Sequence, residues 1–132
     1  MIYLDTSAAL KSIIREEGTD IVRALFSHDA QFVASRLLAA ELHSAVERRA
    51  LPVESIAWLL DRVELVSLDD TVLSRSITLQ TGLRTLDALH LATALDLAPD
   101  VTDILTFDAE LLSAAMAHGL RDARTGGVGA RP

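Results

Sequence analysis

Short apolar runs alternate with longer amphipathic stretches along the chain. The short runs are rich in Ile, Leu, Val and Phe and are predicted strands, over residues 2–4, 31–34, 63–68, 104–107 and 120–123. The longer stretches carry apolar residues at helical spacing and are predicted helices, over residues 6–14, 20–28, 36–50, 52–61, 70–82, 86–97 and 109–118. This alternation predicts an α/β fold with a short, mainly parallel central sheet covered by helices on both faces.

Residues suited to helix ends support these boundaries. Those expected at helix starts are Ser35, Pro52, Asp69 or Asp70, and Thr85, and Gly119 is expected just after a helix end. Residues 124–132 carry glycines and lack apolar periodicity, so they are predicted to form a flexible tail. Residues 1–123 then make one domain, a length that suits a single core.

Composition narrows the possible chemistry. Half of the residues are hydrophobic, and the absence of cysteine excludes disulfides, thiolate zinc sites and cysteine nucleophiles. No stretch reaches the length of a membrane span, and no basic segment precedes the first predicted strand. We therefore expect a cytoplasmic protein that is not exported.

Four carboxylates occupy positions that otherwise look like core or strand ends. Asp5 and Asp108 each follow a predicted strand, and Glu41 and Asp87 lie inside helical stretches rich in Leu and Ala. The carboxyl ends of parallel strands meet at one edge of a sheet, where ligands bind in such folds. Because clustered carboxylates are costly to bury without cations, the pattern indicates a divalent metal site suited to phosphodiester chemistry.

Each acid also has a simpler interpretation. Asp5 and Asp108 can cap the helices that follow them. The Asp87 charge is favoured by the dipole of the helix that it begins. Glu41 can lie at the rim of an apolar stripe, with its carboxylate in solvent. The joint pattern is more specific than any single member.

The ordered set of motifs resembles the PIN-domain family, and more narrowly the ribonuclease toxins of VapBC-type toxin–antitoxin pairs. The most specific parts are Leu-Asp-Thr-Ser-Ala at residues 4–8, the segment of residues 84–94, and Thr-Phe-Asp-Ala-Glu-Leu at residues 106–111. A single Glu within a helix, as at Glu41, is a weaker match. The resemblance covers residues 2 to about 120.

The resemblance implies a PIN-like fold and a metal-dependent endoribonuclease. The residues concerned are Asp5, Glu41, Asp87 and Asp108 as catalytic metal ligands, with the hydroxyls of Thr6, Ser7 and Thr106 in support. The expected cofactor is Mg²⁺ or Mn²⁺, both of which prefer oxygen ligands. Water activated by the metal would cleave RNA to leave a 5′-phosphate and a 3′-hydroxyl. The expected partners are a cognate antitoxin protein and a second copy of the chain, in a homodimer and a toxin–antitoxin hetero-oligomer.

The charge balance is less typical of a protein that binds RNA. The formal net charge is −7, and Lys11 is the only lysine among 12 basic residues. Lys11 and Arg15 share a helix face and can reach phosphates, although a solvated helix face explains them better. His90 follows Asp87 by three residues, which favours a place in the core or behind the acids over metal ligation.

Two other classes of protein share an acidic site. A receiver domain needs a lysine near a late strand, and an acid-nucleophile phosphatase needs a second Asp where Ser7 stands. A PIN-like interaction module without catalysis would have lost acids, and none of the four is missing. RNA cleavage with and without divalent metal distinguishes these alternatives.

Overall fold

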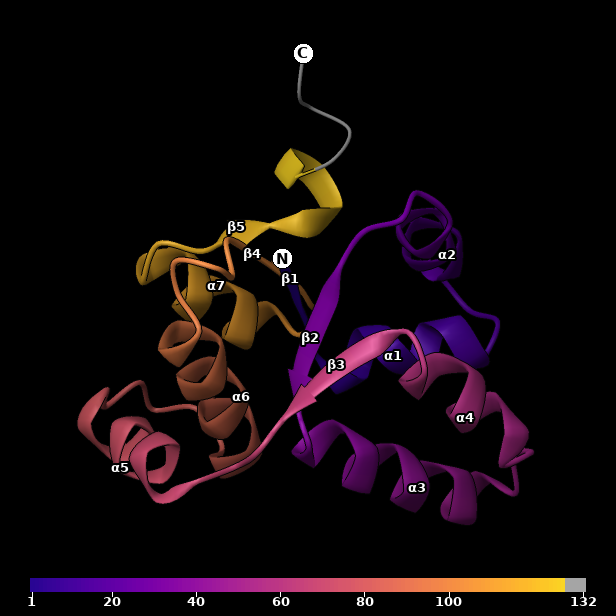
Figure 1. Cartoon of the computed structure of the whole chain (residues 1–132), viewed down its shortest axis with the longest axis horizontal. Helices are drawn as coiled ribbons and strands as arrows, with labels where there is room; N and C mark the ends of the chain where they lie inside the picture. Colours follow the sequence, from indigo (N-terminus) through magenta and orange to yellow (C-terminus); the bar gives the residue numbers. More distant parts are fainter. Residues whose placement is uncertain (128–132) are drawn as a thin grey trace.

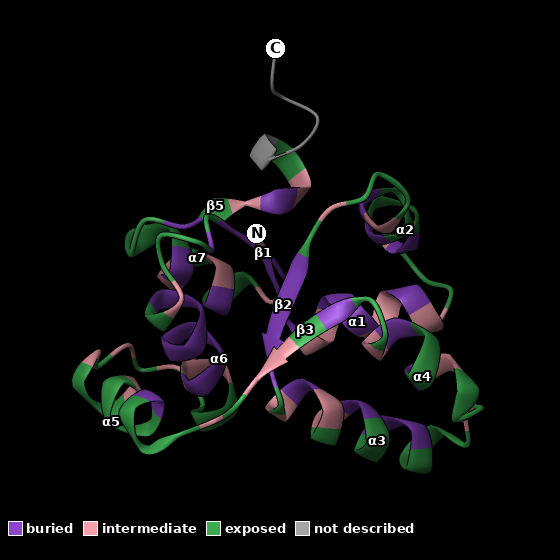
Figure 2. Cartoon of the chain, viewed as in Figure 1, coloured by how far each residue is buried: buried purple, intermediate pink, exposed green. Residues whose placement is uncertain are grey.

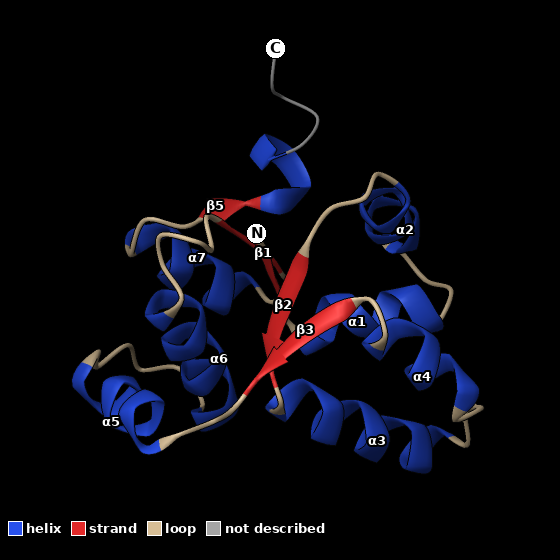
Figure 3. Cartoon of the chain, in the orientation of Figure 1, coloured by secondary structure: helices blue, strands red, loops and turns tan. Residues whose placement is uncertain are grey.

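The central sheet consists of five strands that are all parallel to their neighbours (Figures 1 and 3). The computed structural model describes residues 1–127. The strands are β1 (Ile2–Leu4), β2 (Phe32–Ser35), β3 (Val63–Val66), β4 (Asp103–Leu105) and β5 (Arg121–Asp122), in the spatial order β3-β2-β1-β4-β5. The α/β fold with a parallel sheet, predicted from the sequence, is confirmed.

Seven α-helices within residues 1–127 lie in two groups on the two sides of this sheet (Figure 1). One group holds α1 (Thr6–Ile13), α2 (Thr19–Ser27), α3 (Leu37–Arg49) and α4 (Glu54–Leu60). The other holds α5 (Asp70–Thr78), α6 (Thr85–Asp96) and α7 (Ala109–Ala117). Because the chain runs outward from β1 to β3 and then returns to β4, the strand order reverses between β1 and β4. Such a reversal is where open parallel sheets bind ligands, beyond the carboxyl ends of the strands.

The core lies between the sheet and these helices (Figure 2). Every residue of β1, β2 and β4 is buried, as expected for strands that are covered on both faces. Helix α6 is buried continuously from Leu89 to Leu95, so it presents almost no polar face. Leu4 of β1 pairs in register with Leu105 of β4, and the Asp5 amide donates to the Leu105 carbonyl at 3.1 Å. This register places the residues that follow β1 and β4 side by side.

Three predicted helix starts are wrong in detail. Ser35 belongs to β2 rather than to a helix cap, although its hydroxyl accepts a hydrogen bond from the Leu37 amide at 3.0 Å. Pro52 precedes α4, which begins at Glu54. Thr85 lies inside the first turn of α6, and the backbone at Arg84 provides the cap without a side-chain hydrogen bond.

Two predicted ends also extended too far. The helix expected to reach Gly82 ends at Thr78, because the chain turns at Gln80, whose φ angle is +50°. The strand expected over residues 104–107 ends at Leu105, which leaves Thr106 and Phe107 in a short connection before Asp108. Gly119 follows α7 with a φ angle of +97°, a left-handed conformation that glycine adopts readily.

The segment after the sheet differs from the expected tail. Residues Ala123–Gly127 form one π-helical turn, and the Arg124 guanidinium pairs with Asp122 at 3.1 Å. The predicted tail therefore begins inside a structured turn, while residues 128–132 lie outside the described residues. Across residues 1–127, no helix combines the length and the apolar character needed to cross a bilayer.

Candidate active site

Asp5 stands at the carboxyl end of β1 and is 3 % exposed. Its backbone is extended, and the carboxylate caps α1 by accepting a hydrogen bond from the Ser7 amide at 3.3 Å. The same oxygen, Oδ2, also accepts hydrogen bonds from the Ser7 hydroxyl at 2.7 Å and the Thr106 hydroxyl at 2.8 Å. The capping role proposed from the sequence is therefore real, and it occupies only one carboxylate oxygen.

Two hydroxyls join the segments that follow β1 and β4. Ser7 Oγ accepts a hydrogen bond from the Phe107 amide at 2.9 Å, and Thr106 Oγ1 accepts one from the Asp108 amide at 3.1 Å. Asp108 caps α7 through Oδ1, which accepts from the Leu111 amide at 3.0 Å. Asp5 and Asp108 are thus connected through the hydroxyls of Ser7 and Thr106.

Glu41 reaches the same region from the middle of α3. Its Oε1 atom accepts a hydrogen bond from the Thr6 hydroxyl at 2.6 Å, and His90 Nε2 lies 2.6 Å from the same oxygen. Burial alone would raise the pKa of Glu41, but the hydrogen bonds from His90 and Thr6 outweigh burial, so this pKa is lowered. Glu41 is therefore held as a carboxylate.

Asp87 lies half-buried in the first turn of α6. Burial raises the pKa of Asp87, and the negative charges of Asp108 and Asp5 raise it further. The carboxylates of Asp5 and Asp108 thus act electrostatically on Asp87.

His90 is 1 % exposed, and it connects the acids. Its Nε2 atom lies 2.6 Å from Glu41 Oε1 and 3.9 Å from Asp5 Oδ1. Burial would lower the pKa of His90, but the hydrogen bond to Glu41 and the charges of Asp5, Glu41 and Asp87 raise it overall. The location in the core behind the acids, favoured from the sequence, agrees with this geometry.

Tyr3 also belongs to this region, although the sequence pattern indicated only an apolar strand residue. Its hydroxyl lies 2.7 Å from His90 Nδ1 and accepts a hydrogen bond from the Ser35 amide at 3.1 Å. A tyrosine in an otherwise aliphatic strand was the one signal that could have identified it, since a buried phenol needs a hydrogen-bond partner.

Three of the four acids share one pattern. One carboxylate oxygen accepts hydrogen bonds from protein groups, and the other accepts none within residues 1–127. Asp5 is held through Oδ2, Glu41 through Oε1 and Asp108 through Oδ1. Within residues 1–127 the other oxygen of each accepts no hydrogen bond, and neither does the Asp87 carboxylate. These hard oxygen donors, together with the mutual repulsion of the aspartates, fit a divalent cation such as Mg²⁺ or Mn²⁺.

The side chains do not form a closed cage. In the described part of the chain, no three acidic or imidazole groups are gathered closely enough to hold an ion between them. Mg²⁺ usually keeps several of its waters and takes only one or two protein carboxylates directly. The open arrangement therefore suits a cation that is held partly through water.

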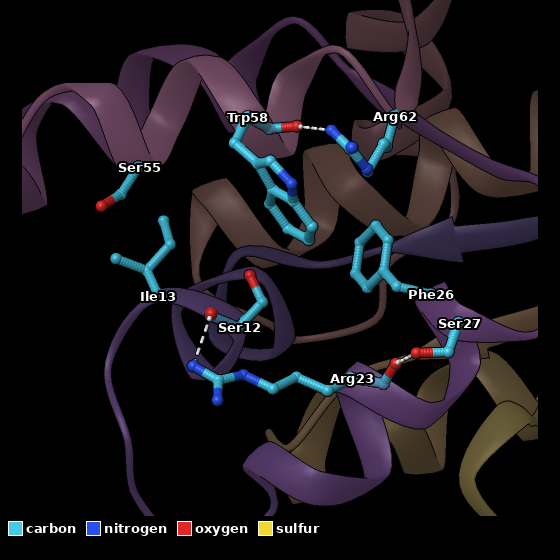
Figure 4. A pocket seen from close by; sticks show the side chains of 8 residues that line it. All are labelled: Ser12, Ile13, Arg23, Phe26, Ser27, Ser55, Trp58 and Arg62. Carbon is cyan, nitrogen blue, oxygen red and sulfur yellow. Dashed lines mark hydrogen bonds between the residues drawn. The ribbon is translucent and has the colours of Figure 1, made fainter.

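A separate cavity of about 550 Å³ lies among α1, α2 and α4 (Figure 4). It is lined by Ser12, Ile13, Arg23, Phe26, Ser27, Ser55, Trp58 and Arg62. Phe26 lies against Trp58 with ring centroids 5.8 Å apart, and the Arg62 guanidinium lies 4.2 Å from the centroid of the Trp58 ring. None of the four acids lines this cavity.

Comparison with known proteins identifies the family. The family model described as PIN domain matches residues 2–117. Ribonuclease VapC47 of Mycobacterium tuberculosis is 35% identical over 135 residues, which cover 97% of this chain and 99% of that protein. Ribonuclease VapC46 of the same species is 34% identical and covers 90% of this chain and 93% of that protein. The chain therefore belongs to the PIN-domain family, as a VapC-type ribonuclease.

Solved structures share the fold at lower identity. VapC20 of M. tuberculosis, described as a Sarcin-Ricin loop cleaving toxin, aligns with a TM-score of 0.68 and 15% identity, covering 86% of this chain and 95% of that chain. PAE2754 of Pyrobaculum aerophilum aligns with a TM-score of 0.64 and 20% identity, covering 94% of this chain and 84% of that chain. Because the chain belongs to the PIN-domain family, it is a ribonuclease, which is a hydrolase. This excludes the receiver-domain and phosphatase alternatives.

Proposed function

We propose that this protein is a toxin endoribonuclease whose acids Asp5, Glu41, Asp87 and Asp108 bind Mg²⁺ or Mn²⁺ and cleave RNA. The observation that carries the proposal is the set of oxygens left without protein hydrogen bonds at the reversal between β1 and β4. A catalytically inactive PIN-like module would have no need for four acids at this place.

The chain's own residues hold the reacting groups in place. Asp5, Asp87 and Asp108 would hold the cation directly or through water, and Glu41 completes the ring. A bound divalent ion lowers the pKa of water and offsets negative charge on the scissile phosphate. The hydroxyls of Thr6, Ser7 and Thr106 keep the carboxylates oriented, so little reorganisation is needed when RNA binds. The expected products carry a 5′-phosphate and a 3′-hydroxyl.

The proposed protein partner is a cognate antitoxin, because relatives of this chain are VapC ribonucleases and a structural neighbour is described as a toxin. The cavity among α1, α2 and α4 suits an apolar helix of such a partner, with Phe26 and Trp58 as aromatic contacts. Arg23 and Arg62 would meet acidic residues that flank the apolar positions. An arginine from the same partner could occupy the acidic site, since guanidinium binds carboxylates with two parallel hydrogen bonds. We also propose a homodimer and a cytoplasmic location.

The proposed activity is tested with protein purified free of any partner and a fluorescent single-stranded RNA. Cleavage is expected with Mg²⁺ or Mn²⁺, loss of cleavage with EDTA, and recovery when the metal is restored in excess. Mass spectrometry of the fragments would identify the 5′-phosphate. Undiminished cleavage in EDTA would contradict the metal mechanism, and intact RNA under every condition would favour the interaction module.

A further inference from the structure

A chain of hydrogen bonds runs from the sheet through Tyr3 and His90 to Glu41. The Tyr3 ring is fully buried in β1, and His90 is 1 % exposed in α6. Buried polar groups are costly unless they are hydrogen-bonded, so both side chains depend on the partners that surround them. Those partners come from β1, β2, α3 and α6. The chain of hydrogen bonds therefore connects helices on the two sides of the sheet.

The donors and acceptors in this chain can be assigned from its geometry. The Ser35 amide is a fixed donor, and it donates to the Tyr3 hydroxyl at 3.1 Å. The Tyr3 hydroxyl retains its own proton, and His90 Nδ1, 2.7 Å away, accepts from it when the imidazole is neutral. A neutral imidazole that accepts at Nδ1 carries its proton on Nε2.

That proton faces Glu41. His90 Nε2 lies 2.6 Å from Oε1 of Glu41, at the distance expected for a charge-assisted hydrogen bond. The opposite tautomer would direct the Nε2 lone pair at a carboxylate oxygen, which is repulsive. In the neutral imidazole Tyr3 therefore selects the tautomer that Glu41 requires, and the protonated imidazole presents the same Nε2–H to Glu41.

We infer that Tyr3 and His90 are positioning residues of the ribonuclease site, because the hydrogen bond to Tyr3 orients the imidazole whose Nε2 holds the Glu41 carboxylate. This inference rests on the proposed function of the acids. Glu41 has three side-chain torsions and projects from α3, on the other side of the sheet from α6. Hydrogen bonds from Thr6 and His90 to Oε1 restrict those torsions and leave Oε2 for the cation. The same turn of α6 carries Asp87, so His90 sets Glu41 in relation to the aspartates.

Tyr3→Phe is the central test, because it keeps the ring and removes only the hydroxyl. In the full-length, metal-free protein, two-dimensional ¹⁵N NMR of the imidazoles reports which His90 nitrogen carries the proton. On the alkaline side of the His90 titration, where the imidazole is neutral, we expect the Nε2–H form in the wild type and a mixture of tautomers in Tyr3→Phe. Titration with Mn²⁺ alone, followed by calorimetry, should show binding weakened about fivefold to tenfold. RNA cleavage should lose about tenfold in kcat, with KM changed less than twofold.

Thr19→Val is the matched control. The Thr19 hydroxyl is also buried and also makes two hydrogen bonds, with the Glu16 amide and the Ile14 carbonyl at the start of α2, and neither bond involves any of the four acids. It should lose stability comparably and keep the His90 tautomer, the Mn²⁺ affinity and kcat. His90→Gln adds a second test, because its amide can donate to Glu41, and it should retain at least fivefold more activity than His90→Leu.

The outcomes separate this inference from the function on which it rests. If Tyr3→Phe matches Thr19→Val in tautomer, Mn²⁺ affinity and kcat, the positioning role is wrong and the proposed nuclease stands. If the wild type itself neither binds Mn²⁺ nor cleaves RNA, the proposed function is wrong. Equal activity of His90→Gln and His90→Leu would overturn the hydrogen-bond argument even where Tyr3→Phe fails to fold.

Discussion

At the scale of single residues, the site depends on carboxylates that serve two purposes. Asp5 and Asp108 each cap a helix with one oxygen, and the other oxygen accepts no hydrogen bond within residues 1–127. The simpler interpretation of these residues as helix caps and the functional one are therefore compatible. A substitution that keeps the cap and removes the charge separates the two contributions.

Asp87→Asn removes a charge from the site while keeping the shape of the side chain. The Asp87 carboxylate is half-buried and accepts no hydrogen bond within the described residues, so we expect it to bind the cation. We expect RNA cleavage to fall at least about a hundredfold, which corresponds to roughly 3 kcal/mol of activation free energy. Asp96→Asn, at the exposed far end of the same helix, is the control and should cleave like the wild type. Full activity of a folded Asp87→Asn protein would remove Asp87 from the site.

Asp108→Asn tests the link between charge crowding and stability. Asparagine also caps helices well, so the cap of α7 is retained, while the negative charge that acts on Asp87 is lost. We expect a higher melting temperature in EDTA and a smaller gain with Mn²⁺. The wild type should gain about 2.7 kcal/mol at a hundred times the dissociation constant.

Asp69→Asn is the matched control for the thermal melts of Asp108→Asn in EDTA and with Mn²⁺. Asp69 caps α5 through a hydrogen bond from the Val72 amide at 2.9 Å, the same contact that Asp108 makes with Leu111. It should leave the gain with Mn²⁺ unchanged. Equal gains in Asp108→Asn and the wild type would leave Asp108 as a helix cap alone.

At the scale of elements, the turn between α1 and α2 packs against the segment that carries Asp108. Gly18 has a φ angle of +95°, and a Cβ atom there would lie 2.7 Å from a ring carbon of Phe107 and 2.9 Å from the Lys11 side chain. The Lys11 ammonium lies 4.8 Å from the centroid of the Phe107 ring, so the ring has little room to move. This close approach holds the connection between β4 and α7 against the first helices.

Gly18→Ala should therefore destabilise the protein more than a positive φ angle alone explains. Gly119 has nearly the same φ angle, +97°, but a Cβ atom there meets nothing within 4 Å. We expect Gly119→Ala to cost about 1 kcal/mol of unfolding free energy and Gly18→Ala a further 1–3 kcal/mol or so from overpacking. Urea denaturation of both variants measures the difference, and equal losses would show that Phe107 and Lys11 adjust without cost.

At the scale of the whole molecule, the acidic site and the aromatic cavity lie in different places. Asp5 and Asp108 follow the carboxyl ends of β1 and β4, and Glu41 and Asp87 lie on α3 and α6, whereas the cavity lies among α1, α2 and α4 (Figures 1 and 4). A partner that binds the cavity and also reaches the acids would have to extend along the surface. In the proposed complex, one antitoxin segment would bind the apolar side chains of the cavity while another would block the acidic site.

Trp58→Ala tests the anchoring half of this arrangement. Trp58 is 45 % exposed and packs against Phe26 and Arg62, so its loss removes a large apolar contact. We expect inhibition of RNA cleavage by the cognate antitoxin to weaken about tenfold or more, measured relative to the activity of each free variant. Ile77→Ala, on α5 and 76 % exposed, lies outside the cavity and should be inhibited like the wild type. Unchanged inhibition of Trp58→Ala would place the partner elsewhere.

Local sequence was sufficient to predict the strands, the helices and the parallel sheet. Apolar periodicity depends on which face of an element is buried, and the short apolar runs at residues 2–4 and 104–105 are typical of strands covered on both faces. The errors at Ser35, Thr85 and the end of α5 arose because several adjacent residues could form each boundary. Tertiary contacts, such as the pairing of β2 with β3 that extends through Ser35, chose among them.

The four acids were also proposed from the sequence, because charged residues in apolar surroundings and after strands are conspicuous along a single chain, and their role as metal ligands stays a prediction. The sequence favoured a place for His90 in the core or behind the acids, but it could not show that Tyr3 belongs with them. Residues 3 and 90 become neighbours only when α6 packs against the sheet, and the partner that each polar group finds in the core depends on contacts distant in sequence. Which oxygen of each carboxylate is held, and which is left for a cation, was likewise decided by the tertiary structure, since those hydrogen bonds join residues up to 101 positions apart.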